Sequence, residues 1–162
     1  MDVNCRMFVS AGLLAWYVAV SIWMAQAPTD PQFWLIASVL PMSDQPVRTL
    51  VSTDEGELAF QHYFVRRRCE PVVKGFRFDG ADRAQPSPEV IDALSSPDLR
   101  GVIVCPSNPY VSIGPMLAVA GFRGRLQALD VPIVAVSPIV GGKAIKGPAA
   151  KMMQELATPP SA

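Results

Sequence analysis

The stretch of residues 101–156 constrains the fold most, because it contains two strand–loop–helix units in succession. Residues 101–105 and 132–136 are short apolar runs without polar alternation, which is typical of strands buried on both faces of a sheet. A helix is predicted after each run, over about residues 112–129 and 148–156. Consecutive units of this kind predict parallel strands joined by right-handed crossovers.

The part of the chain before these units adds a hairpin and a third helix. Residues 47–52 and 57–64 nearly alternate in polarity around a turn with Gly56, which predicts a β-hairpin. The run Ser87-Pro88-Glu89 predicts a helix start, because serine is a favoured cap and proline fits the first helical position. Further apolar runs that predict strands are residues 35–40 and 72–78. Together these elements predict an α/β domain.

An apolar leader over residues 1–34 precedes this domain, and no charged residue occurs between Arg6 and Asp30. Residues 8–25 approach the length of about 20 residues that a membrane span needs. They also resemble a signal-peptide core, with Ala25-Gln26-Ala27 as a cleavage site. A buried core helix, or a start that is not native to the fold, explains the same residues. The leader therefore stays open among a membrane segment, a core helix and a non-native start.

Charge and cysteine content exclude two classes of protein. The 162 residues hold 14 basic and 14 acidic side chains, so no excess of Lys and Arg exists to displace the counterions of a nucleic acid. The three cysteines lie far apart, without a dense disulfide framework or the C-x-x-C spacing of a zinc site. We therefore expect no nucleic-acid partner.

The loops after the two apolar strands carry residues suited to an anionic ligand. Hydroxyl, amide and helix-start positions after the first strand are Ser107, Asn108 and Ser112. The loop after the second strand contains two glycines, which allow a ligand to approach the backbone closely, and two cations. These residues are Gly141, Gly142, Lys143 and Lys146. Each residue alone is equally typical of a tight turn or a solvated lysine. Because ligands collect at the carboxyl ends of parallel strands, the set together favours phosphate binding.

Four motifs occur in a recognisable order. They are residues 40–47 (LPMSDQPV), Phe60-Gln61, residues 106–109 with 112–115, and residues 134–142 with 146–149. In this order they resemble the 2-phospho-L-lactate transferase family of coenzyme F-420 biosynthesis, over roughly residues 36–156. The resemblance implies a Rossmann-like parallel sheet with flanking helices and a β-hairpin. It also implies a magnesium-dependent cytoplasmic enzyme that transfers a phospholactyl or phosphoenolpyruvyl group from a GDP-activated donor to the ribityl hydroxyl of the deazaflavin Fo, releasing GMP.

The resemblance also implies roles for individual residues. Asp44 is the only acidic residue inside a family-like motif, and it is predicted as a magnesium ligand or as a partner of the acceptor hydroxyl. No catalytic residue is assigned. The predicted nucleotide or phosphate contacts are Ser107, Asn108, Pro109, Ser112, Gly114, Ser137, Gly141, Gly142, Lys143 and Lys146.

The chain departs from the family pattern at both ends. The family opens with a strand, a glycine-rich phosphate loop and acidic motifs that do not occur before Trp34, and it continues past the last predicted helix. We therefore expect an incomplete domain over residues 35–156 with a short tail over 157–162, which binds nucleotide weakly and does not turn over. The alternative is a non-catalytic nucleotide-binding remnant or a module tethered to a membrane through residues 8–25. A homo-oligomer that covers exposed sheet edges is a further prediction.

Overall fold

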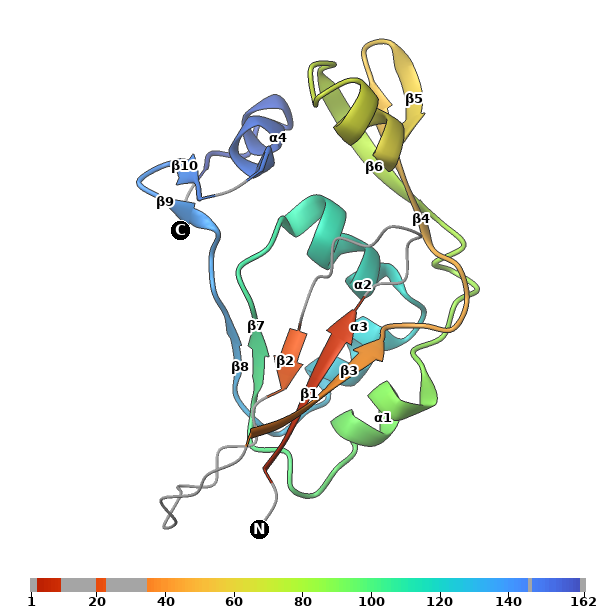
Figure 1. Cartoon of the computed structure of the whole chain (residues 1–162), viewed down its shortest axis with the longest axis vertical. Helices are drawn as coiled ribbons and strands as arrows, with labels where there is room; N and C mark the ends of the chain where they lie inside the picture. The colour runs from red at the N-terminus through yellow and green to blue at the C-terminus, as the bar shows by residue number, and fades with distance from the viewer. Residues whose placement is uncertain (1–2, 10–19, 23–34, 146, 161–162) are drawn as a thin grey trace.

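The computed structural model describes residues 3–9, 20–22, 35–145 and 147–160. Figure 1 shows a central five-stranded sheet in the order β3-β1-β2-β7-β8. Its strands are β1 (Val3–Val9), β2 (Val20–Ile22), β3 (Leu35–Pro41), β7 (Val102–Val104) and β8 (Ile133–Ala135). The predicted α/β class is confirmed.

The direction of the strands differs from the prediction in one respect. β1 is parallel to β3 and β7 is parallel to β8, whereas β2 runs antiparallel to both β1 and β7. Four strands therefore point the same way and β2 lies reversed among them. The central sheet is mixed rather than purely parallel, because a segment of the leader enters it between the two parallel pairs.

The described part of the predicted leader is strand rather than helix. Phe8 and Val9 belong to β1, and β2 supplies three more residues of the 8–25 segment. β1 pairs with β3, and β2 pairs with β7, so the backbone groups of both leader strands form hydrogen bonds within the sheet. Residues 10–19 and 23–34 lie outside the described residues. None of the helices in the described part is long and apolar enough to cross a membrane.

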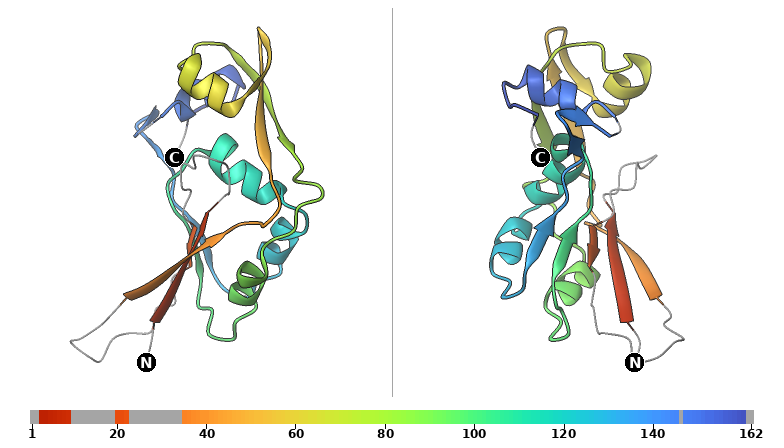
Figure 2. Two further views of the ribbon diagram at one scale, coloured as in Figure 1. Left: turned by 45° about the vertical axis from the view of Figure 1, so that its right-hand side comes forward. Right: turned by 90° about the vertical axis from the view of Figure 1, so that its left-hand side faces the viewer.

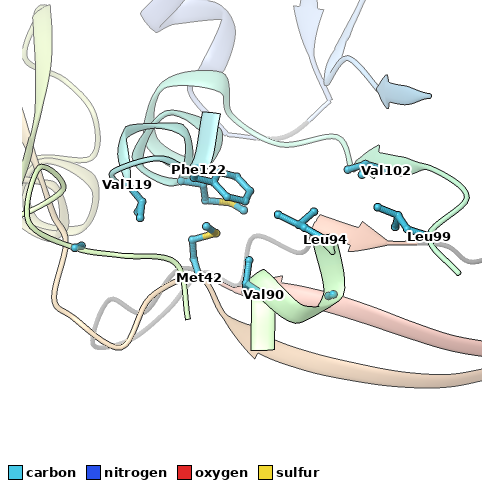
Figure 3. Packing of buried hydrophobic residues seen from close by; sticks show 10 residues of the cluster. Met42, Val90, Leu94, Leu99, Val102, Val119 and Phe122 are labelled. Atoms are coloured by element: carbon cyan, nitrogen blue, oxygen red, sulfur yellow. The ribbon is translucent and has the colours of Figure 1, made fainter. Parts of the chain in front are cut away.

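Helices α1 (Pro88–Leu94), α2 (Gly114–Ala118) and α3 (Phe122–Gln127) enclose the main core with β7. Figure 3 shows Met42, after β3, meeting side chains of these helices. α1 begins at the predicted proline, but the Ser87 hydroxyl does not cap it. That hydroxyl donates to the Pro41 carbonyl at 2.8 Å and ties α1 to the end of β3. Members of the core cluster are Met42, Ala84, Val90, Ala93, Leu94, Leu99, Val102, Met116, Val119 and Phe122.

The helix predicted over residues 112–129 is divided into three parts. A five-residue π-helical turn, η2 (Pro109–Ile113), runs directly into α2, and α3 follows after a break. The backbone of Val119 is extended (ψ 132°), and Gly121 adopts a left-handed conformation (φ 75°). Gly121 permits this reversal without the steric cost that another residue would meet.

A second, antiparallel sheet lies beside the C-terminal helix (Figure 2). Its order is β5-β4-β6, and Thr53 pairs with Gly56, so the predicted hairpin is confirmed. The second arm is shorter than predicted, because a π-helical turn follows β5. The C-terminal helix is also confirmed. Bounds of these elements are β4 (Arg48–Thr53), β5 (Gly56–Ala59), η1 (His62–Arg66), β6 (Val73–Asp79), β9 (Ile139–Val140), β10 (Lys143–Ala144) and α4 (Ala149–Glu155).

The predicted double burial of the strands over residues 101–105 and 132–136 holds for neither strand in full. Val102 is buried, but Ile103 and Val104 keep intermediate exposure. All three residues of β8 are exposed, because β8 is the last strand of the sheet.

Candidate functional site

The candidate site lies where β7 and β8 end. The two strands are parallel, with Val102 opposite Ile133 and Val104 opposite Ala135. The segments that follow them therefore leave the sheet at the same edge. β3 points in the same direction, so the loop with Asp44 leaves from this edge too. The topology thus gathers the predicted residues at one end of the sheet, as the sequence suggests.

Asn108 shapes the segment after β7. Its side-chain oxygen accepts hydrogen bonds from the backbone N–H groups of Tyr110, at 2.9 Å, and Val111, at 3.3 Å. Its backbone carbonyl accepts from the N–H groups of Ser112 and Ile113, both at 3.1 Å. These are the donors that an anion at the helix start would use. The start of this helix therefore offers no free N–H group at these four positions, because Asn108 already accepts from them.

The other predicted residues of this segment divide into polar and packing positions. Within the described residues, the hydroxyls of Ser107 and Ser112 have no hydrogen-bond partner, and both residues are half-buried. Pro109 is exposed and opens η2. A Cβ atom at Gly114 would lie 2.9 Å from Cζ of Phe78 and 3.2 Å from the Pro109 carbonyl oxygen. Gly114 therefore allows η2 to approach β6 closely.

The segment after β8 forms a small hairpin. Gly141 (φ 56°) and Gly142 (φ 74°) join β9 to β10 as a two-residue turn, with Val140 opposite Lys143. Positive φ at both central positions is the requirement of a type I′ turn, so the two glycines already have a structural reason. Ser137 accepts a hydrogen bond from the Ile139 N–H at 3.1 Å.

Two lysines were predicted beside this hairpin. Lys143 is exposed and has no ion-pair partner among the described residues. Lys146 lies outside the described residues. The Lys143 ammonium group is therefore the available cation of this segment where the structure describes it.

Helix α4 holds the two segments together. The Asn108 amide Nδ2 donates to Sδ of the buried Met152 at 3.3 Å. Ile139 packs with Ala149 of α4, and Tyr110 packs against the same cluster. Tyr110 also stacks on Phe76 of β6, with ring centroids 5.3 Å apart. The site therefore depends on contacts across three elements that are distant in the sequence.

A polar cluster under α4 was not foreseen from the sequence. The Lys151 ammonium group donates to the Pro71 carbonyl at 3.0 Å, lies 3.5 Å from the Tyr63 hydroxyl and pairs with the carboxylate of Glu155. The other carboxylate oxygen of Glu155 accepts from the N–H of Val73 at 3.0 Å. The only sequence signal was the four-residue spacing of Lys151 and Glu155. Lys151 thus secures α4 rather than facing a ligand.

Burial changes the titration of two groups in this cluster. It raises the pKa of Tyr63 well above the ordinary value for tyrosine, and the nearby carboxylate of Glu155 acts in the same direction. Burial also raises the pKa of the Cys69 thiol, partly offset by the charge of Lys151. Both groups are therefore kept neutral, which suits a structural role and not that of a nucleophile.

The described residues contain no preformed cluster of metal ligands. No group of three or more histidine, cysteine or acidic side chains in the described part of the chain could hold a metal ion. Asp44 is exposed on a loop that Gln45 fixes, since the Gln45 side chain accepts from the Ser43 hydroxyl and the Gln85 N–H. Asp44 offers a single carboxylate, which holds magnesium only together with water and substrate phosphates, and we derive no chemical step through the metal.

Comparison with known proteins points to one family. The family model described as "2-phospho-L-lactate transferase CofD" matches residues 32–160. The 2-phospho-L-lactate transferase of Methanopyrus kandleri is 42% identical over 123 residues, and that of Methanosarcina mazei is 41% identical over 121 residues. These alignments cover 76% and 75% of this chain, but only 38% and 39% of the relatives. The chain therefore spans less than half the length of the curated relatives it matches.

One more relative and one solved structure are similar to parts of the chain. The phosphoenolpyruvate transferase of Mycobacterium avium is 40% identical over 117 residues, covering 68% of this chain and 34% of the relative. A solved structure from the UPF0052 family of Bacillus halodurans has a TM-score of 0.49 at 18% identity, covering 61% of this chain and 31% of its own.

Proposed function

The chain belongs to the 2-phospho-L-lactate transferase family, and from this membership we propose a role in transferring a phosphorylated three-carbon acid. The donor is activated by GDP, the acceptor is the ribityl hydroxyl of the deazaflavin Fo, and GMP is released. The supporting observation is that the matched region, residues 32–160, contains both segments that leave the sheet beside β7 and β8. Ligands of open α/β sheets bind at such an edge. A cytoplasmic location belongs to the same proposal.

Residues whose polar groups have no partner within the protein are the proposed ligand contacts. Ser107 and Ser112 have hydroxyls without partners among the described residues, and Lys143 has an unpaired ammonium group there. We assign these three to the donor nucleotide and its phosphates, because hydroxyls and cations bind phosphate oxygens. Asn108 and the glycines Gly114, Gly141 and Gly142 shape the segments that carry them. Pro109, Ser137 and Lys146 stay predicted contacts.

We further propose that this chain alone binds a guanine nucleotide weakly and does not catalyse transfer. Phosphoryl-type transfer depends on positioning and on neutralising charge, usually with a metal between the phosphates. The described residues offer Asp44 but no cluster of metal ligands. In this proposal, further magnesium ligands and the rest of the acceptor site lie outside the described residues.

Calorimetric titration of the full chain with GDP and magnesium tests the binding proposal. We expect saturable binding that Lys143→Ala weakens by about tenfold or more, since a charge-assisted hydrogen bond contributes about 1.5–3 kcal/mol. Ser107→Ala should weaken it less. Arg125→Ala is the matched control, because Arg125 is exposed on α3, which leads to the amino end of β8. A folded chain that does not bind GDP would refute the proposal and leave a remnant without nucleotide binding.

The absence of turnover has its own assay. The chain is incubated with Fo, a GDP-activated donor and magnesium, and GMP is quantified by chromatography. We expect no GMP above the level without protein. GMP release that scales with protein concentration would show that this chain carries a complete catalytic site.

A further inference from the structure

Helix α4 contacts three parts of the protein that are distant from one another in the sequence. Figure 1 shows it between the β9–β10 hairpin and the second sheet. Ala149 packs with Ile139 of β9, whereas Met152 is fully buried in a cluster with residues of β4, β6 and η1. Met152 also accepts the hydrogen bond from Asn108. Both segments of the candidate site therefore contact this one helix.

α4 is too short to be stable by itself. It has seven residues, and no side chain caps its start. Isolated helices of fewer than about 12 residues are only marginally stable in water, so the contacts of α4 with the rest of the protein decide whether it forms. The position of the two site segments therefore depends on what attaches α4 to the second sheet.

Lys151 attaches α4 to the second sheet with its whole ammonium group, which has three N–H donors. Their acceptors are the Glu155 carboxylate at 2.5 Å, the Pro71 carbonyl at 3.0 Å and the Tyr63 hydroxyl at 3.5 Å. Glu155 in turn accepts from the N–H of the buried Val73, the first residue of β6. The donors of Lys151 are thus used within the protein, and its contacts lie where β6 begins.

We propose that Lys151 is a positioning residue of the candidate site. It fixes α4 on the second sheet and thereby places the η2 start and the β9–β10 hairpin, so that Ser112 and Lys143 can bind one ligand. Lys151 itself does not contact that ligand. The identity of the ligand rests on the proposed function, whereas the coupling of α4 to the two segments is a property of the fold.

Coupling of this kind is reciprocal. If a nucleotide binds only to chains in which α4 is docked, the bound nucleotide also keeps α4 docked. The Val73 N–H reports on docking, because its hydrogen bond to Glu155 breaks when α4 leaves the sheet. The N–H groups of Tyr110 and Ser112, which donate to Asn108, report on the η2 start.

Amide hydrogen exchange of the full chain, resolved by residue with NMR, tests the coupling without a ligand. Lys151→Met keeps an unbranched side chain but removes its charge and its donors. We expect exchange at Val73 to quicken by about tenfold, the change that corresponds to one hydrogen bond of a charged group. Exchange at Tyr110 and Ser112 should quicken with it. Amides of the β4–β5 hairpin should keep their wild-type rates, which separates undocking of α4 from a general loss of stability.

Two further variants make this test specific. Lys151→Arg keeps a cation with several donors and should restore most of the protection. Lys74→Met is the matched control, because Lys74 is exposed on β6 directly after Val73. It removes the same charge from the same region and should leave the exchange rates at their wild-type values.

Exchange of the wild type with GDP tests the role of docking in binding. At a GDP concentration of about ten times Kd, exchange at Val73 should slow by about tenfold, since a ligand of the docked state alone shifts the equilibrium by that factor. Amides of the β4–β5 hairpin should slow less. By calorimetry, Lys151→Met should bind GDP more weakly than both the wild type and Lys151→Arg, because fewer chains are competent to bind.

Two results would overturn the proposal. Faster exchange in Lys151→Met at Val73 alone, with Ser112 unchanged, would show that α4 moves without the site. GDP binding to the wild type without added protection of Val73 would show that docking and binding are independent, and this measurement needs no variant that has to fold. A wild type that does not bind GDP would refute the proposed function instead, and the exchange rates without ligand would still decide whether Lys151 positions the two segments.

Discussion

Substitutions of Asn108 distinguish two possible roles of this residue, contact with the ligand and capping of the helix start. In Asn108→Ala, the N–H groups of Tyr110 and Val111 lose their acceptor, and Met152 loses the amide donor at 3.3 Å. Loss of a side-chain cap costs about 0.5–2 kcal/mol, with about 1 kcal/mol typical. The contact with the Met152 sulfur adds little, because a thioether is a weak acceptor. We therefore expect Asn108→Ala to lower the free energy of unfolding by about 1–2 kcal/mol.

Asn108→Ser is the informative counterpart, because serine keeps an acceptor at the cap position. Its stability should lie within about 0.5 kcal/mol of the wild type. Urea denaturation of the three proteins measures the difference, and calorimetry with GDP is run on the same samples. If Asn108 acts by shaping the segment, GDP affinity falls in the alanine variant and is retained in the serine variant. Wild-type stability of Asn108→Ala, or loss of GDP binding in a fully stable Asn108→Ser, would refute this reasoning.

Three further predictions concern the packing around the site. Glu155→Ala should destabilise the fold by about 1–3 kcal/mol in urea denaturation, because the buried Val73 N–H loses its acceptor, whereas Glu155→Gln keeps an acceptor and should cost less. Gly114→Ala should cost about 1–3 kcal/mol, because its Cβ meets the Phe78 ring, and the cost should be smaller in a Phe78→Leu background; equal costs would contradict that contact. The raised pKa of Tyr63 means that the folded state keeps a proton which the unfolded chain releases above pH 10.0. The stability of the wild type should therefore fall more steeply with pH above that value than the stability of Tyr63→Phe, as measured by urea denaturation at several pH values.

Local pattern was sufficient for most elements. The apolar runs over residues 101–105 and 132–136 predict β7 and β8 to within a residue or two at each end, because β-branched runs between turn residues have few alternatives. The Ser87-Pro88-Glu89 start predicts α1. Gly56 predicts the turn of the hairpin. In each case the signal lies within a few neighbouring residues.

What the sequence did not predict depends on residues far apart. Whether β8 is buried or at an edge is decided by which strand pairs beside it, and its own residues do not encode that neighbour. The reversed strand β2 pairs on one side with the preceding strand β1, but on the other side with β7, which is distant in the sequence. The polar cluster under α4 is a further case, because Lys151 donates to the Pro71 carbonyl only when α4 packs against the second sheet. Such contacts follow from tertiary packing and not from periodicity.

The candidate site shows why residue type alone could not assign roles within it. Asparagine, serine and glycine bind phosphates because they offer short polar groups or an open backbone, and they form caps and turns for the same reason. At Asn108, Gly141 and Gly142 the structure uses that chemistry for the chain itself. A polar group that already bonds to the backbone can bind a ligand only if the loop gives up that bond, which costs about as much as the bond contributes. Under the proposed function the ligand binds at this edge of the sheet, and Ser107, Ser112 and Lys143 can bind it without such a cost, because their polar groups have no partner among the described residues.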